Sequence, residues 1–189
     1  TAKLTLPDVP VTAPESPWMT MTREECRNFV EQTVARETSN YREGLFQLGH
    51  EEQYRSRRIA DICEKVCWVC VEQVRAGQIL SSRFEVPFAP GGQMPPIVYH
   101  ASRGDGLLTG KIDRVDILRG ERVKIIDYKT GNENFSKSEA EAGYRLQLML
   151  YLNACLGERT GGEARKPAGV FYFHISEPMV DWSAKEPDA

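Results

Sequence analysis

The chain has 189 residues, of which 41% are hydrophobic and 27% charged, which is ordinary for one soluble domain with a core of its own. No apolar run approaches the roughly 20 residues of a membrane-spanning helix, and no stretch resembles a signal peptide, so we expect a cytoplasmic protein. The net charge of −3 argues against a protein that holds nucleic acid through phosphate contacts alone.

The first part of the chain is expected to be helical. Residues 1–20 contain four prolines and predict an extended arm. Thr22 followed by Glu25 has the spacing of a capping box, which predicts a helix to about residue 38. A long helix is expected from about Glu51 to Arg75, ending at Gly77. Residues 21–78 should therefore form a helical segment that packs on the rest of the protein.

The pattern then changes to strands. Strands are expected at residues 81–88, 97–101, 107–118 and 122–130, with a turn at 102–106, followed by a helix at 138–157 and a strand at 168–176. This order predicts an α/β core over residues 79–180, with a mixed sheet flanked by helices. Residues 181–189 would be a tail, and we expect the chain to be part of a longer protein.

Five cysteines do not indicate a disulfide framework, because the count is odd and the chain is not small and loop-rich. Cys63, Cys67 and Cys70 would lie on one helix face. They could form a metal or iron–sulfur site, but a buried stripe with Ile59, Ile62 and Val66 is the favoured interpretation, because free cysteine is among the most buried residue types.

Two carboxylates are predicted to meet across a β-hairpin. Gly120 sits at its natural tip, and a hairpin centred there pairs residues whose numbers sum to 240. Asp113 then lies opposite Asp127, and Lys129 shares their face two residues further on. Because directly opposed like charges are destabilising, a divalent cation such as Mg²⁺ or Mn²⁺ would suit the pair.

An amine beside such a metal could help water attack a phosphodiester. The simpler alternative is a salt-bridged strand end that faces solvent, with Arg114 and Asp116 in ordinary surface pairs. Gly110 and Gly131 bracket these strands, so substrate could approach closely. Gln147 and Tyr151 lie at i and i+4 on the next helix, and could hold a phosphate and a base.

Three motifs together resemble a known family. The stretches "GKIDRVD", "IIDYKTG" and "QLMLY" are similar to the signature of the RecB-like branch of the PD-(D/E)XK nucleases. The segments "RFEVPFAPGGQMPP" and "KPAGVFYFHISEPMV" resemble the nuclease domain of the AddB/RexB family, over about residues 18–180. That family supplies one of the two subunits of AddAB-type helicase–nucleases, which process double-strand DNA ends for recombinational repair.

The resemblance implies a restriction-endonuclease-like fold and a role for each matched residue. Asp113 and Asp127 would bind Mg²⁺ or Mn²⁺ together with the backbone carbonyl of Tyr128, and Lys129 would be the catalytic lysine. Substrate DNA, as a single strand, would be supported by Gln147 and Tyr151. Glu85 falls where the family often has a glutamate, and is a further candidate ligand. An AddA-like helicase–nuclease subunit is the implied protein partner.

Two departures from the family pattern concern histidine and cysteine. A histidine on an upstream helix usually completes the metal site, but His50, His100 and His174 are not in the expected setting, and His50 in "QLGHEE" is only a faint match. The family's iron–sulfur cluster needs a C-x-x-C-x-x-x-x-x-C arrangement that this chain does not contain.

Two alternatives to an AddB-like nuclease stay open. The chain could be a non-catalytic module of nuclease-like fold that guides DNA or joins subunits. It could also belong to a stand-alone RecB-like nuclease of the CRISPR-associated or phage type.

Overall fold

The computed structural model describes residues 10–41, 49–131, 136–143, 146–157, 159–160 and 163–175. The first nine residues of the predicted arm and the predicted tail at 181–189 lie outside these residues. A four-stranded mixed sheet in the order β1-β4-β5-β8 forms the centre of the fold. Its strands are β1 (Ile79–Phe88), β4 (Gly110–Leu118), β5 (Arg122–Lys129) and β8 (Lys166–His174). Neighbours are antiparallel except β5 and β8, which are parallel.

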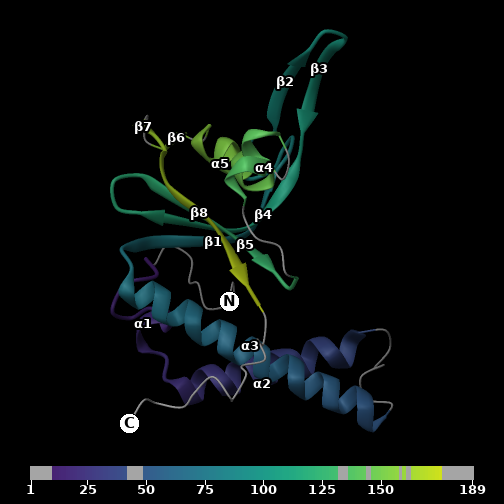
Figure 1. Ribbon diagram of the computed structural model, residues 1–189. Coiled ribbons are helices and arrows are strands. Elements are labelled where there is room, and N and C mark those ends of the chain that lie inside the picture. Colours follow the sequence, from purple (N-terminus) through teal and green to yellow (C-terminus); the bar gives the residue numbers. More distant parts are fainter. Residues whose placement is uncertain are drawn as a thin grey trace, which may run out of the picture.

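Helices cover both faces of this sheet, as expected for an α/β fold (Figure 1). On one side lie α1 (Pro17–Thr20), α2 (Arg23–Asn40) and the long α3 (His50–Ala76); on the other lie α4 (Lys137–Glu141) and α5 (Gln147–Leu156). Two small ribbons complete the described elements: β2 (Ile97–Ala101) with β3 (Gly104–Leu108), and β6 (Arg159–Thr160) with β7 (Glu163–Ala164). The mixed sheet flanked by helices is the predicted fold class.

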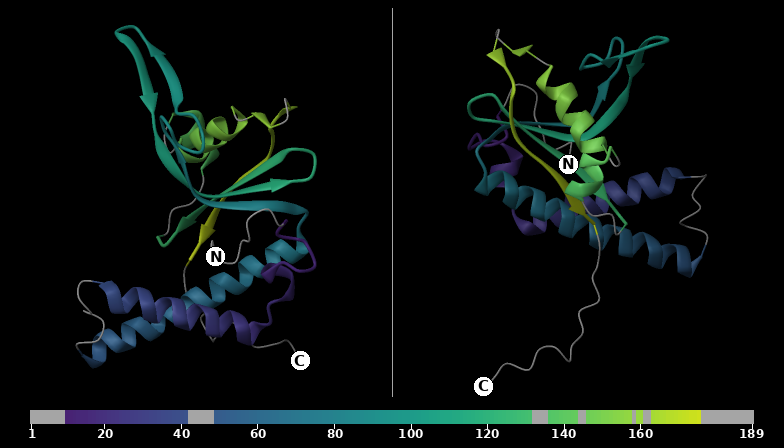
Figure 2. Two further views of the ribbon diagram at one scale, coloured as in Figure 1. Left: turned by 180° about the vertical axis from the view of Figure 1, so that it is seen from behind. Right: turned by 45° about the horizontal axis from the view of Figure 1, so that its top comes forward.

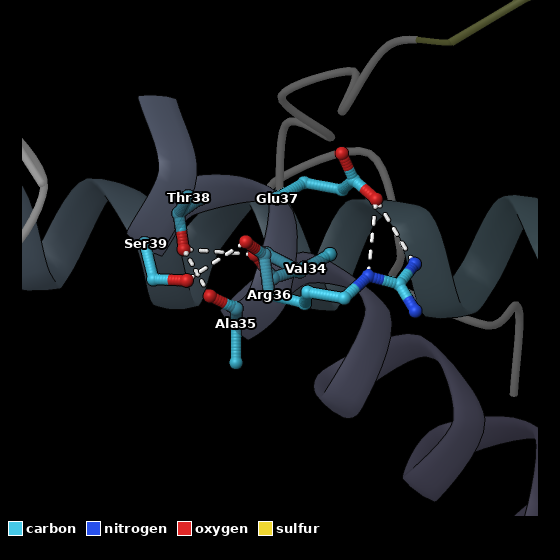
Figure 3. A network of polar contacts seen from close by, with 6 residues as sticks. All are labelled: Val34, Ala35, Arg36, Glu37, Thr38 and Ser39. Carbon is cyan, nitrogen blue, oxygen red and sulfur yellow. Dashed lines mark hydrogen bonds and ion pairs between the residues drawn. The ribbon is translucent and has the colours of Figure 1, made fainter. Parts of the chain in front are cut away.

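The predicted capping box begins α2. Thr22 accepts a hydrogen bond from the backbone N–H of Glu25, whose carboxylate accepts one from the N–H of Thr22 at 2.7 Å. This reciprocal arrangement satisfies two donors that a helix start leaves open, and it lowers the pKa of Glu25. At the other end, Thr38 and Ser39 donate hydroxyl hydrogen bonds to carbonyls of the preceding turn (Figure 3). The start of α2 is therefore capped by its own side chains, whereas at its end the backbone N–H of Tyr41 donates to the carbonyl of Thr38.

The sheet separates two apolar cores. One joins α1, α2 and α3 to the start of β1, and centres on the fully buried Trp18. The second lies between the opposite face and α5, where Leu148, Ala154 and Cys155 pack on strand residues such as Val115 and Ile125. Each strand of the sheet must therefore present side chains to two different interiors.

The β4–β5 hairpin has the predicted register. Its pairs run from Arg114 opposite Ile126 to Leu118 opposite Arg122, and every pair sums to 240. Gly120, at the tip, has a φ of +73°, a conformation that glycine adopts without strain. Continuing this register by one residue brings Asp113 beside Asp127.

The expectation of surface ion pairs for Arg114 and Asp116 is wrong. Both side chains are fully buried on the α3 face, with Arg114 Nε 2.8 Å from Asp116 Oδ1. Asp116 also accepts a hydrogen bond from Ser82 at 2.7 Å and pairs with Lys124 at 2.9 Å. Burial alone would lower the pKa of Arg114, but the charge and hydrogen bond of Asp116, together with Tyr128, more than offset this, so the pKa of Arg114 is raised and the guanidinium stays charged.

Two predicted elements are divided in the structure. The single strand expected at 107–118 is two strands in different sheets, because β3 ends at Leu108 and β4 begins at Gly110. The turn expected at 102–106 is shorter, since β3 already begins at Gly104. The helix expected at 138–157 is broken between α4 and α5.

The predicted cysteine stripe is only partly buried. Cys67 and Cys70 are buried, whereas Cys63 is exposed and Ile59 is 38% exposed. Burial raises the pKa of Cys67 to about 12, which makes a thiolate ligand unfavourable there. The buried face of α3 is continued by Val71 and Val74. Among the described residues, no helix has the length and apolarity needed to cross a membrane.

Candidate active site

Asp113, Asp127 and Lys129 come together on the α5 face of the sheet. Side chains alternate along a strand, so Asp127 and Lys129 share the face of the buried Ile125, whereas Tyr128 points to the α3 side, where its hydroxyl lies 3.6 Å from Cys70 Sγ. The polar end of β5 thus continues the apolar surface beneath α5.

Asp113 is held across the hairpin by the backbone. Its Oδ2 accepts a hydrogen bond of 2.9 Å from the N–H of Tyr128. Burial raises the pKa of Asp113 despite this bond, and the neighbouring charge of Asp127 adds to the increase. Lys129 acts in the opposite direction, and a divalent cation between the two carboxylates would likewise favour the charged form of Asp113.

Asp127 is 2% exposed and forms an ion pair with Lys129, whose Nζ lies 2.8 Å from Asp127 Oδ2. Within the described part of the chain, no hydrogen bond of good geometry reaches this buried oxygen. The Lys129 ammonium therefore compensates the buried charge of Asp127, and a divalent cation at this carboxylate would share it with the lysine.

Lys129 connects this carboxylate to helix α5. Its ammonium donates a hydrogen bond of 3.0 Å to Gln147 Oε1, and Gln147 Nε2 donates one of 2.7 Å to the Tyr151 hydroxyl. Burial raises the pKa of Tyr151, which keeps the phenol protonated. The predicted pair at i and i+4 therefore lies at the site, where Gln147 contacts Lys129 and Tyr151 contacts Gln147; that these side chains support DNA stays a prediction.

Tyr172 is a site residue that the sequence did not indicate. The Lys129 ammonium lies 5.4 Å from the centre of its ring, a favourable cation–π distance. Tyr172 comes from β8, directly opposite Asp127 in the parallel register. Parallel pairing between strands so far apart in sequence leaves no local signal, so the alternation of "VFYFH" alone could not have assigned it.

Glu85 does not join the two aspartates. It lies exposed on β1 with a φ of +53°, and its carboxylate forms an ion pair with Lys111 on β4. The pairs on either side, Phe84 with Arg114 and Val86 with Ile112, place it level with Asp113. Its charge still contributes to the raised pKa of Asp113, so it lies near the site without entering it.

Two of the three histidines are apart from these residues, whereas His174 pairs with Lys129 in the β5–β8 register and its ring lies 6.4 Å from that of Tyr172. His50 begins α3 and is exposed, and His100 pairs with Asp105 on the β2–β3 ribbon at 2.6 Å. His174, at the end of β8, lies 3.3 Å from the carbonyl of Gly131. No described histidine takes the place that the family pattern expects.

Gly110 leaves a space on the strand that a neighbouring ring fills. A Cβ at this position would lie 2.6 Å from Cζ of Phe88, so the ring occupies the space that the missing side chain leaves. Phe88 in turn meets the Tyr151 ring edge-on, with centroids 5.9 Å apart. Gly131 has open space around it.

The site residues fit a hydrated divalent cation. Among the described residues, no group of three or more His, Cys, Asp and Glu side chains could hold a metal. Asp113 and Asp127 nevertheless offer hard oxygen donors that lie side by side, and Asp127 is buried beside the Lys129 ammonium. Mg²⁺ is usually bound by one or two carboxylates and keeps several waters, so two aspartates are a sufficient protein contribution.

Comparison with known proteins shows the family of this chain. Residues 15–188 match the model of a family described as the PD-(D/E)XK nuclease superfamily. The chain is 36% identical over 174 residues to the B subunit of an ATP-dependent helicase/deoxyribonuclease from Alkaliphilus oremlandii, covering 89% of this chain and 15% of the relative. Proteins of the same name from Alkaliphilus metalliredigens and Clostridium tetani are 34% and 32% identical, covering 90% and 86% of this chain and 16% and 15% of the relatives. The chain thus spans about 15% of the length of these curated relatives.

Proposed function

This chain belongs to the PD-(D/E)XK nuclease superfamily, and from that premise we propose that it is a metal-dependent deoxyribonuclease domain of an AddAB-type helicase–nuclease. The observation that supports this best is that Asp127 pairs with Lys129 beside Asp113, whose carboxylate accepts the Tyr128 N–H. Lys129 in turn donates a hydrogen bond to Gln147, and Gln147 donates one to Tyr151. The relatives, which are named as B subunits, support the assignment to the AddB-like component that works with an AddA-like partner.

The reaction we propose is hydrolysis of a phosphodiester in single-stranded DNA. The oxygen of water forms a bond to phosphorus, the bond to one ester oxygen breaks, and that oxygen leaves with a proton. Asp113 and Asp127 would hold Mg²⁺ or Mn²⁺ together with the backbone carbonyl of Tyr128, and Glu85 would join them only by leaving Lys111. When bound, the cation supplies a more acidic water and neutralises charge on the phosphate.

The chain's own residues orient Lys129 for this reaction. Its ammonium is fixed between Asp127 Oδ2 and Gln147 Oε1, and the Tyr151 hydroxyl fixes the orientation of the Gln147 amide. The Lys129 ammonium, held in this position, can donate hydrogen bonds to the attacking water and to a non-bridging phosphate oxygen. Tyr172 limits its movement on the remaining side.

Cleavage of a single-stranded oligonucleotide by the intact full-length protein tests this assignment. With Mg²⁺ or Mn²⁺ present, Asp127→Ala and Lys129→Ala should each reduce cutting by about 100-fold or more, because each removes preorganised charge from the site. The exposed residues Asp61 and Lys166 provide matched controls, and their alanine variants should cut like the parent. Equal activity of all four variants would show that the site is assigned wrongly.

One observation favours a second candidate, a nuclease-like module that guides DNA without cutting it. Glu85 stays outside the site, paired with Lys111, so two carboxylates and not three face Lys129. Such a module would bind single-stranded DNA and leave it intact with every divalent metal. A stand-alone nuclease is less well supported, because the relatives described above are all named as helicase/deoxyribonuclease subunits.

A further inference from the structure

The β2–β3 ribbon projects away from the main sheet (Figures 1 and 2). Its strands pair from Ile97 opposite Leu108 to Ala101 opposite Gly104, and they form a sheet of their own. After Leu108 the chain runs directly into β4, which carries Asp113. The ribbon is thus an extension of the strand that holds the site.

The two faces of the ribbon differ in what they present. Ile97 and Leu108, at its base, pack against the second core, which contains Leu148, Ala154 and Cys155 of α5. Because side chains alternate along strands, Tyr99 and Gly106 share this face. The opposite face carries Val98 and Leu107, which are 52% and 54% exposed.

Tyr99 is placed by the glycine across from it. A Cβ on Gly106 would lie 2.2 Å from Cζ of the Tyr99 ring, so the ring extends across the ribbon over the space that glycine leaves. Tyr99 is nevertheless 53% exposed. The ribbon therefore supports one side of an aromatic ring and leaves much of the ring open to solvent.

The ring lies on the ribbon that leads directly into the strand of Asp113. The chain from Gly106 to Asp113 is short, so their Cα atoms are at most about 25 Å apart even when it is fully extended. Tyr99 also shares its face with the residues that pack on α5, and α5 carries Gln147 and Tyr151 of the site. Arg103, exposed at the ribbon tip, adds a positive charge for a phosphate backbone.

We propose that Tyr99 is a stacking platform for a base of single-stranded DNA whose phosphodiester lies at Asp113 and Asp127. This inference rests on the proposed nuclease function and names a residue that positions its substrate. An exposed aromatic ring stacks on any base, because every base has a π face, so the contact holds the strand without selecting its sequence. Loss of one such contact weakens binding by about 5- to 100-fold.

Fluorescence anisotropy of a labelled single-stranded oligonucleotide, with the intact protein in EDTA, tests the platform without cleavage. Tyr99→Ala should weaken binding by about 5- to 100-fold, and Tyr99→Phe should retain it because the ring remains. Leu107→Ala is the matched control, since Leu107 has a similar exposure on the other face. Gly106→Ala should also weaken binding, because its Cβ displaces the ring without removing it.

Cleavage kinetics separate this proposal from the proposed function. In an active protein, Tyr99→Ala should raise KM for oligonucleotides and leave kcat at saturation close to that of the parent.

Three outcomes distinguish the proposals. If DNA is cut but Tyr99→Ala binds it as tightly as Leu107→Ala, the stacking platform is wrong and the nuclease proposal stands. If binding depends on Tyr99 but no metal supports cutting, the nuclease is wrong. If Tyr99→Ala and Leu107→Ala weaken association with a protein partner and not with DNA, the ribbon is a protein-binding surface and the proposal fails.

Discussion

At the scale of single residues, Asp116 shows how much charge this fold buries away from its chemistry. The carboxylate is fully buried and contacts Ser82, Arg114 and Lys124, which come from three different strands. Removing one member of such a group leaves the others charged and without compensation in a medium that solvates them poorly. The network therefore constrains the strands that also carry the candidate site.

Asp116→Ala should lower the free energy of unfolding by about 3–5 kcal/mol, the usual cost of breaking a buried ion pair by removing one partner. Urea denaturation followed by circular dichroism would measure it. Asp61→Ala, which removes an exposed carboxylate from α3, should change the same quantity by less than about 0.5 kcal/mol. Similar values for the two variants would contradict a structural role for the buried network.

The sequence could indicate Asp113, Asp127 and Lys129, but not the role of Arg114 and Asp116. The first three follow from strand alternation and the position of one glycine, which are local properties. Arg114 and Asp116 have the same charged, alternating pattern as a solvated strand. Their burial depends on α3, which packs over them from a much earlier part of the chain.

At the scale of secondary structure elements, the β4–β5 hairpin could be predicted closely and the β3–β4 junction could not. The hairpin register is set by its own tip, where Gly120 and Glu121 both have positive φ. The division at residue 109 depends instead on β1, which pairs with β4 but not with β3. Nothing in the local alternation of residues 107–118 reports on that distant partner.

Gly110→Ala should destabilise the fold by about 1–3 kcal/mol, because the new Cβ would lie 2.6 Å from the buried Phe88 ring and force it to move. The ring's edge contact with Tyr151 would be disturbed at the same time. Thermal and urea unfolding would measure the loss.

Gly131→Ala offers the matched control, since a Cβ there meets nothing within 4 Å and Gly131 does not have positive φ. It should unfold within about 0.5 kcal/mol of the parent. If both glycine variants were equally stable, the Phe88 ring would not need the space at Gly110.

At the scale of the whole molecule, the sheet separates two kinds of interior. The α3 face is filled by the buried ion network and the core around Trp18, and the α5 face holds the second core and the site. The α/β class and the mixed sheet were predictable because helical and strand periodicities alternate along the chain. The contact of the Tyr172 ring with Lys129 was not predictable from the sequence, because it depends on β8 lying beside β5.

Divalent cations should stabilise the entire fold through Asp113 and Asp127. Thermal unfolding with and without Mg²⁺ or Mn²⁺ would measure this without any DNA. At a metal concentration about 100 times the dissociation constant, the gain should be about 2.7 kcal/mol. Asp127→Asn should lose this gain, whereas Asp105→Asn, a change on the exposed ribbon, should keep it. A metal-dependent shift that persists in Asp127→Asn would place the cation elsewhere.

The parallel pairing of β5 with β8 also has a consequence for the time course of folding. β4 and β5 are joined by a three-residue turn, so this hairpin closes early, with little loss of chain entropy. β8 begins at Lys166, and α5, which supplies Gln147 to Lys129, lies in the long crossover between them. During synthesis, the two aspartates can therefore meet while the lysine still has no amide to hold it. The candidate site would then be complete only after β8, the strand that completes the sheet, has emerged.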